Sequence, residues 1–245
     1  MKLTVAYRIS NGSYQKNRLP HATKEHCLRN FIEVFKEFNQ FYDSRLILFM
    51  DNCNAETANM ILQVLPVQME PNIWWGVVKI NGGSSAQSFN RTLDYVMKMG
   101  LGDDDCVYFL EDDYLHKPFA LTILKQGLER AQYVSLYDHP DKYTNEEDGG
   151  NPYVEDGGEV TRVFRTESCH WKLTNSTTMT FAVHFPILKA DEPVWRKYTE
   201  GTYPQDFHAF MQLRYISRTL ATPLPGYSTH TEVDWLSPYT NWSKI

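Results

Sequence analysis

The chain has 245 residues, 42% hydrophobic and 22% charged, which is enough apolar material for the core of one large α/β domain. Its net charge of −6 argues against a nucleic-acid backbone or an anionic membrane as the main partner. No apolar run approaches the roughly 20 residues that a membrane-spanning helix needs, so we expect no integral membrane segment.

The beginning of the chain and its cysteines indicate the compartment. Residues 1–7 enter a strand pattern at once, without the basic and apolar regions of a signal peptide. The four cysteines form no Cys-x-x-Cys pair, which argues against a zinc site and favours small core residues in a reducing environment. We therefore expect a cytoplasmic protein.

Strand and helix patterns alternate through the first half of the chain. Apolar spacing predicts strands over 3–9, 46–50, 74–80 and 106–110, helices over 23–42, 54–65 and 85–97, and a loop over 10–20. Pro118 is expected to begin a further helix, with His116 beside its first turn. This alternation is typical of a parallel sheet covered by helices.

The pattern becomes shorter and mixed after residue 132. Strands are predicted over 133–136, 160–164 and 178–184, helices over 191–200 and 207–217, and an irregular tail from 222. Residues 138–158 are acidic and glycine-rich, with Asp156-Gly157 at a tight turn. Because this loop has little apolar surface to bury, we expect it to be mobile.

The most informative stretch joins a buried strand to a group of acids. The apolar run 106–110 leads directly into Glu111, Asp112 and Asp113. Unpaired buried charge is costly, so these acids must emerge at the carboxyl end of the strand, where open α/β sheets bind ligands. A hard cation, Mn²⁺ or Mg²⁺, would compensate their mutual repulsion. The alternative is a solvated acidic turn before a helix.

Residues 108–113, Tyr-Phe-Leu-Glu-Asp-Asp, resemble the acidic metal-binding motif of glycosyltransferases with the GT-A fold. The resemblance implies a three-layer α/β/α fold with a mostly parallel, Rossmann-like central sheet in a single domain, 1–245. Residues 1–116 would bind the nucleotide sugar, and the mixed half, 117–245, would bind the acceptor. It also implies transfer, with inversion, from a nucleoside-diphosphate sugar to a hydroxyl of a saccharide or lipid-linked acceptor.

The same resemblance assigns roles to individual positions. Asp113 corresponds to the acid that binds the metal, and Asp112 and Glu111 to acids that contact ribose, base or metal-bound water. Asp51, at the end of the second strand, would contact the nucleotide, although an Asx turn or helix cap explains it equally well. Arg8 lies in the region that holds the nucleotide, and a surface arginine is the alternative.

Two further residues come from the second half of the chain. His230 lies where several GT-A enzymes place a second metal ligand, although it is one of eight histidines. Asp206 precedes a helix where inverting enzymes place the general base, but an acid there also stabilises the helix dipole. Trp171, Trp195 and Tyr203 are candidates to stack on a sugar, with core packing as the alternative.

Two other classes of function are compatible with these residues. The acids and aromatics could belong to a Ca²⁺-dependent carbohydrate-binding module, although most lectins are all-β. The acids would also suit a metal-dependent nucleotidyltransferase or phosphohydrolase.

Overall fold

A computed structural model of the chain describes residues 2–12, 16–65 and 73–245. Its helices are α1 (Lys24–Asn39), α2 (Ala55–Val64), α3 (Ser85–Met97), α4 (Ala120–Leu128), α5 (Phe185–Tyr198) and α6 (Asp206–Tyr215). Its strands are β1 (Leu3–Ser10), β2 (Ser44–Asp51), β3 (Ile73–Ile80), β4 (Cys106–Glu111), β5 (Tyr114–His116), β6 (Tyr133–Val134), β7 (Val163–Arg165), β8 (His170–Leu173), β9 (Phe181–His184), β10 (Leu220–Leu224) and β11 (Ser228–His230).

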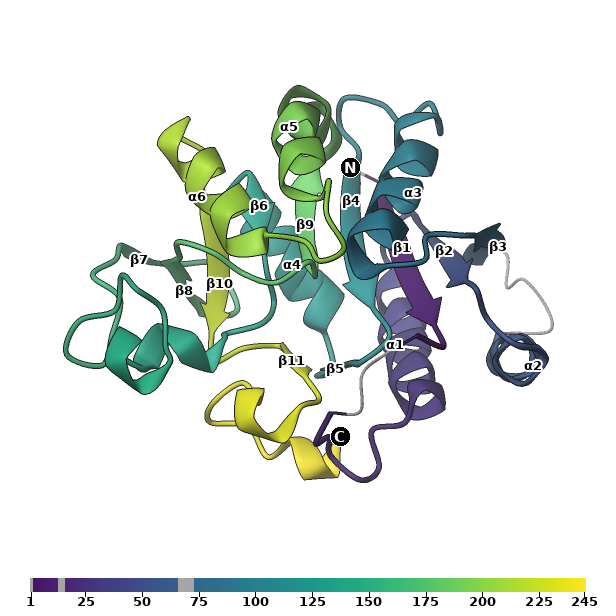
Figure 1. The fold of residues 1–245 in the computed structure, drawn as a ribbon, viewed down its shortest axis with the longest axis horizontal. Helices are drawn as coiled ribbons and strands as arrows, with labels where there is room; N and C mark the ends of the chain where they lie inside the picture. The colour runs from purple at the N-terminus through teal and green to yellow at the C-terminus, as the bar shows by residue number, and fades with distance from the viewer. Residues whose placement is uncertain (1, 13–15, 66–72) are drawn as a thin grey trace.

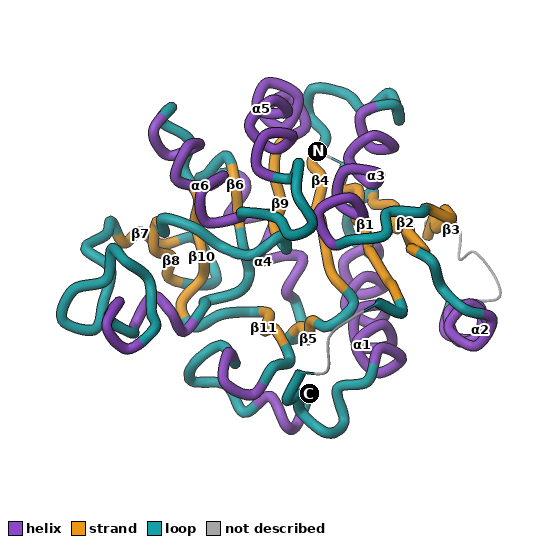
Figure 2. The backbone as a smooth tube through the Cα atoms, in the orientation of Figure 1, coloured by secondary structure: helices purple, strands orange, loops and turns teal. Residues whose placement is uncertain are grey.

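A central sheet runs across the molecule in the order β3-β2-β1-β4-β9-β6-β10-β8-β7 (Figure 1). The first four strands in this order are parallel, and β9 pairs antiparallel with both β4 and β6. A small antiparallel pair, β5 with β11, follows the end of β4 (Figure 2). The parallel half therefore brings the carboxyl ends of β1, β2 and β4 to one edge.

Helices cover both faces of the sheet. Side chains alternate along β1, so that Tyr7 belongs to a core under α1 and α4, while Ala6 belongs to a second core under α3, α5 and α6. Phe31 of α1 lies in the first core, and Phe89 of α3 and Trp195 of α5 lie in the second. This is the three-layer α/β/α arrangement that the sequence predicts.

The predicted helix starts of the first half are confirmed by their caps. The side chains of Thr23, Asn54 and Ser84 accept hydrogen bonds from backbone N–H groups three residues further on, at 3.1, 2.8 and 3.2 Å. Of the loop predicted over 10–20, residues 13–15 lie outside the described residues. No helix among the described residues has both the length and the apolar character to cross a bilayer.

The prediction for His116 was wrong. His116 ends strand β5 and is fully buried, and Pro118 precedes α4, which begins only at Ala120 after Phe119 takes the left-handed conformation (φ 62°). The strand forms because β11, more than a hundred residues later, supplies its hydrogen-bonding partner. Local periodicity carries no information about such a partner.

Several boundaries in the second half also differ from prediction. Helix α5 begins at Phe185 rather than near 191, because Pro186 fits the first turn and Phe185 and Leu188 pack into the core. Strands β8 and β10 were not predicted. Pro223 is tolerated in β10 because β6 pairs only with Leu220 and Ala221.

The acidic loop is tied down by buried lysines, which argues against the predicted mobility. Lys142 and Lys172 are 2% and 4% exposed. Lys172 lies 3.1 Å from a carboxylate oxygen of Asp138 and 3.4 Å from one of Glu159, and Lys142 lies 3.0 Å from Asp141. The loop thus compensates its lack of apolar surface with buried ion pairs.

Candidate active site at the carboxyl edge of the parallel strands

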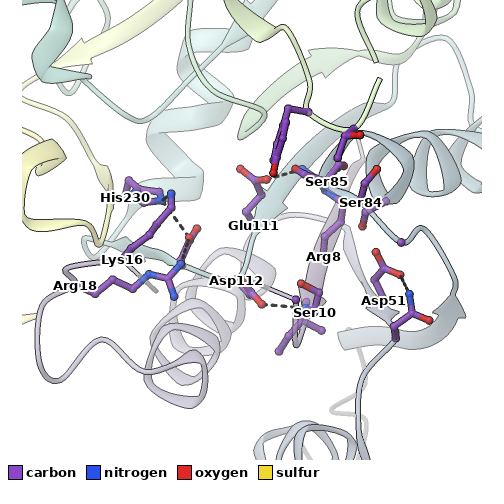
Figure 3. A pocket seen from close by; sticks show the side chains of 18 residues that line it. Arg8, Ser10, Lys16, Arg18, Asp51, Ser84, Ser85, Glu111, Asp112 and His230 are labelled. Atoms are coloured by element: carbon purple, nitrogen blue, oxygen red, sulfur yellow. Dashed lines mark hydrogen bonds and ion pairs between the residues drawn. The ribbon is translucent and has the colours of Figure 1, made fainter. Parts of the chain in front are cut away.

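A cavity of about 430 Å³ lies at the edge where β1, β2 and β4 end. Its walls also include the start of α3, the α5–α6 connection and strand β11 (Figure 3). This volume is within the range of small-molecule sites. The lining residues with polar side chains are Arg8, Ser10, Lys16, Arg18, Asp51, Asn52, Ser84, Ser85, Ser88, Glu111, Asp112, Asp113, Thr202, Tyr203 and His230.

Glu111 and Asp112 each contact a cation from another part of the chain. An oxygen of Glu111 lies 3.0 Å from the Arg8 guanidinium, and Asp112 accepts hydrogen bonds from Lys24 and from the backbone N–H of Ser10. Burial raises the pKa of both carboxyls, against the opposing charges of Arg8 and Lys24. These contacts offset part of the cost of burying two adjacent acids at the strand end.

Asp113 has the strongest cationic surroundings. Its Oδ2 accepts a 2.8 Å hydrogen bond from Arg18 and lies 3.1 Å from His230 Nε2. Burial acts to raise the pKa of Asp113, but His230 and Arg18 outweigh it and hold this pKa below its usual range. Asp113 is therefore a firmly ionised carboxylate.

His230 reaches Asp113 through strand pairing. Strand β11 pairs with β5 so that His230 lies opposite Tyr114, one residue after Asp113. The two rings also meet edge to face, with centroids 5.4 Å apart. The β5–β11 ladder is thus what sets the histidine beside the acid.

Asp113 and His230 are the residues present that could ligate a divalent cation. Among the described residues, no group of three or more His, Cys, Asp or Glu side chains is arranged to hold a metal. Mg²⁺ is commonly held by only one or two carboxylates plus substrate phosphates, and imidazole is a suitable ligand for several divalent metals. The pair therefore fits a cation whose remaining ligands come from a phosphorylated substrate and water.

Asp51 both lines the cavity and supports the turn before α3. Its Oδ1 accepts a 2.7 Å hydrogen bond from the N–H of Gly82. A Cβ on Gly82 would lie 2.8 Å from Asp51 Oδ2 and 2.5 Å from the nitrogen of Ser88, so only glycine fits there. Asp51 thus supports the turn before α3 rather than the expected Asx turn or cap of the helix at Asn54, which Asn54 caps itself.

The start of α3 presents hydroxyl groups to the cavity. The N–H of Gln87 is bonded to the Ser84 side chain, and the N–H of Ala86 donates to the carbonyl of Thr202 at 3.2 Å. The Thr202 bond holds the α5–α6 connection against α3. It thereby sets Tyr203, which is 55% exposed, on the cavity wall.

The structure brings together most of the predicted site residues but leaves one outside the cavity wall. Those that line the cavity are Arg8, Asp51, Glu111, Asp112, Asp113 and His230. Asp206 starts α6 as predicted and is partly buried, but it is not among the described lining residues. Burial raises the pKa of Asp206, although the N–H of Phe207 and the charge of Lys142 oppose this.

Some site residues were not predicted, and two of the candidates for sugar stacking follow the core-packing alternative. Trp171 and Trp195 are fully buried, so neither can stack on a sugar. Lys16, Arg18 and Lys24 were missed because they lie in or next to a polar loop without periodicity. The signal available in the sequence was that three basic residues follow the end of the first strand.

Comparison with known proteins supports the fold independently. No family model matches the chain, and no curated protein matches its sequence. The solved structure of GalNAc-T7 with UDP, GalNAc and Mn²⁺ superposes with a TM-score of 0.58 at 11% identity, over 91% of this chain and 42% of that one. The mannosyltransferase PcManGT from Pyrobaculum calidifontis, in complex with GDP-Man and Mn²⁺, gives 0.50 at 14% identity, over 90% and 54%.

This chain spans about half the length of these two proteins. At such low identity the likeness establishes the fold rather than the reaction. Together with the strand order and the acids at the end of β4, it shows that the chain has the GT-A fold of nucleotide-sugar glycosyltransferases.

Proposed function

We propose that the chain is a metal-dependent glycosyltransferase. It would transfer a sugar from a nucleoside-diphosphate sugar to a hydroxyl of a saccharide or lipid-linked acceptor. One observation carries the proposal: the three acids that end β4, the Asp113–His230 pair and Arg8 all line one cavity at the carboxyl edge of a GT-A sheet.

The cavity residues divide into three groups by chemistry. Asp51 and Glu111 offer carboxylate oxygens to ribose hydroxyls or base nitrogens. Arg8 and Arg18 offer guanidinium groups, which suit phosphate oxygens. Asp113 and His230 would hold Mn²⁺ or Mg²⁺, which when bound would stabilise the charge that develops on the leaving diphosphate.

The acceptor would enter from the second half of the chain, 117–245. Tyr203 lies on the cavity wall and offers an aromatic face to a sugar ring. Asp206 follows it at the start of α6, and its raised pKa favours a general base. We assign Asp206 this role in a single inverting displacement, for which the acceptor must bridge the cavity and α6.

We place this reaction in the cytoplasm. All four cysteines are free, two of them buried, as expected of a protein in a reducing compartment.

An assay of product formation separates this proposal from the alternatives. The chain would be incubated with Mn²⁺, a panel of nucleoside-diphosphate sugars and mixed saccharide acceptors, and release of nucleoside diphosphate would be followed. A parallel reaction with nucleoside triphosphates and sugar 1-phosphates would report pyrophosphate. We expect nucleoside diphosphate only, with Asp112→Asn impaired and the exposed-acid control Asp43→Asn unchanged.

Release of pyrophosphate would instead identify a nucleotidyltransferase. Binding of free sugars with Ca²⁺, without any turnover, would identify a carbohydrate-binding module. Either result would overturn the proposal.

A further inference from the structure

The cations around Asp113 occupy the atoms that a metal would use. Oδ2 of Asp113 accepts the hydrogen bond from Arg18 and faces Nε2 of His230. That same Nε2 lies 3.5 Å from the ammonium group of Lys16, which also pairs with Glu232 at 3.1 Å. A divalent cation on this carboxylate oxygen would lie beside the Arg18 guanidinium, and their repulsion would be relieved if Arg18 moved to another acceptor.

The backbone of Arg18 is fixed beside the cavity. Its neighbours are anchored to the segment after β11: the N–H of Val233 donates to the carbonyl of Asn17 at 2.8 Å, and the N–H of Leu19 donates to that of Thr231 at 2.9 Å. The Arg18 side chain is 20% exposed. Since its backbone is held, the guanidinium stays within reach of the cavity when it changes partners.

We infer that Arg18 couples metal binding to nucleotide binding. In the structure its guanidinium takes the place beside Asp113 that a cation would take. When a nucleoside diphosphate enters, a phosphate oxygen becomes the acceptor for Arg18, and Asp113 is released to the metal. This inference rests on the proposed function, because it requires a diphosphate ligand in the cavity.

Charge balance explains why the two ligands would bind together. Each acid of the motif already has a cationic partner. Arg8 pairs with Glu111, Lys24 with Asp112 and Arg18 with Asp113. A cation alone would leave the Arg18 charge unpaired at short range, and like charges repel strongly in a partly buried site. A diphosphate supplies the missing negative charge.

Calorimetric titration of the whole chain tests this coupling. Mn²⁺ alone, a nucleoside diphosphate alone (UDP, GDP, ADP and CDP in turn) and both together would be titrated into wild type, Arg18→Gln and Arg18→Lys. In wild type we expect saturating nucleotide to tighten Mn²⁺ binding at least tenfold, and Mn²⁺ to tighten nucleotide binding by the same factor. Arg18→Gln should bind Mn²⁺ alone about tenfold more tightly than wild type and lose most of the coupling.

Two control variants test whether the coupling depends specifically on a positive charge at residue 18. Arg18→Lys keeps the positive charge and should retain most of the coupling. Arg29→Gln removes an exposed arginine that pairs with Glu25 within α1, and it should behave as wild type. Matching thermal melts would show that each variant is folded.

The results separate the inference from the proposed function. Should Arg18→Gln bind Mn²⁺ no more tightly than wild type, or keep the full coupling, the role of Arg18 is overturned while nucleotide binding by wild type still supports the proposed function. Should wild type bind none of the nucleoside diphosphates with Mn²⁺, both are overturned.

Discussion

The three consecutive acids Glu111, Asp112 and Asp113 are each paired with a cation from a separate stretch of the chain. Arg8 lies on β1, Lys24 starts α1, and Arg18 precedes that helix. An unpartnered carboxylate in such partly buried surroundings would take up a proton rather than bind a cation. The pairing thus keeps Asp113 anionic and able to attract a divalent metal.

Asp206 is expected to be required for transfer but not for donor binding. It starts a helix outside the described cavity wall, and a base acts on the acceptor rather than the nucleotide. Asp206→Asn should leave the nucleotide-sugar Kd nearly unchanged and lower kcat roughly a hundredfold or more. Near-wild-type turnover, or a product with retained anomeric configuration by NMR, would remove Asp206 from the mechanism.

His116 should make the folded state sensitive to acid. Burial lowers its pKa to about 3, so the imidazole stays neutral in the folded protein while the unfolded chain takes up a proton below about pH 6.5. Below about pH 6.5 the unfolded state therefore binds more protons than the folded state, so the free energy of unfolding decreases progressively as pH falls. By pH 4.5 the loss from His116 is about 2–3 kcal/mol.

Urea unfolding at pH 7 and pH 4.5 measures this effect. His116→Gln cannot titrate, so its stability should fall less over the same pH interval than that of wild type. Equal losses in the two proteins, or a His116 ring that titrates near pH 6 in NMR spectra, would contradict a buried neutral histidine.

The part of the candidate site that could be predicted from sequence is the part where one segment carries the signal. The adjacency of Glu111, Asp112 and Asp113 to an apolar strand is visible without any tertiary contact. The partnership of Arg18 with Asp113 depends on how a loop packs against residues 231–233, and no local pattern encodes that packing. His230 was proposed from the family resemblance, and its strand partner β5 could not be read from periodicity.

At the scale of elements, the acidic loop and strand β8 depend on each other. Lys172 of β8 contacts Asp138 and Glu159 and donates a 3.1 Å hydrogen bond to the Tyr143 hydroxyl. These contacts connect both ends of the loop to the sheet. The loop is therefore held by charge rather than by apolar burial.

Lys172→Met should loosen this loop and destabilise the protein. The substitution leaves two buried carboxylates without their cation, and breaking a buried ion pair costs about 3–5 kcal/mol. Denaturant unfolding should show a loss of this size, and limited proteolysis should cut between 138 and 159 faster than in wild type. The control Lys36→Met removes an exposed pair with Glu33 and should change stability by less than about 1 kcal/mol.

A stable Lys172→Met variant with an uncleaved loop would show that the network does not hold the loop. The sequence-based expectation of a mobile loop would then be restored.

The elements of the first half could be predicted because each is long and amphipathic. The helix at 24–39 and the strands at 3–10 and 44–51 form within a few residues of their expected limits. In the second half, strands were predicted where β6, β7 and β9 form, but each forms over only two to four residues, and the four-residue strand β8 was missed. Their existence depends on sheet partners that are distant in sequence.

At the scale of the whole molecule, the strand pairing of the sheet changes from parallel to mixed at β4. On one side lie the parallel strands whose ends form the cavity, and on the other lie the mixed strands that carry Asp206 and Tyr203 on their connections (Figure 1). A donor held by the first side and an acceptor held by the second would meet above the acids of β4. The division into donor and acceptor halves near residue 116, which the family resemblance implies, is part of the proposed function.

Thermal unfolding with and without ligands tests the central claim most directly. Wild type and Asp113→Asn would be melted with each nucleoside diphosphate and nucleotide sugar, in Mn²⁺ and in EDTA. A ligand at 100 times its Kd stabilises a folded protein by about 2.7 kcal/mol. We predict that at least one nucleotide raises the Tm of wild type by several degrees in Mn²⁺, much less in EDTA, and hardly at all in Asp113→Asn. An unchanged Tm of wild type with every nucleotide, or an equal shift in Asp113→Asn, would contradict a metal-dependent nucleotide-sugar site at the end of β4.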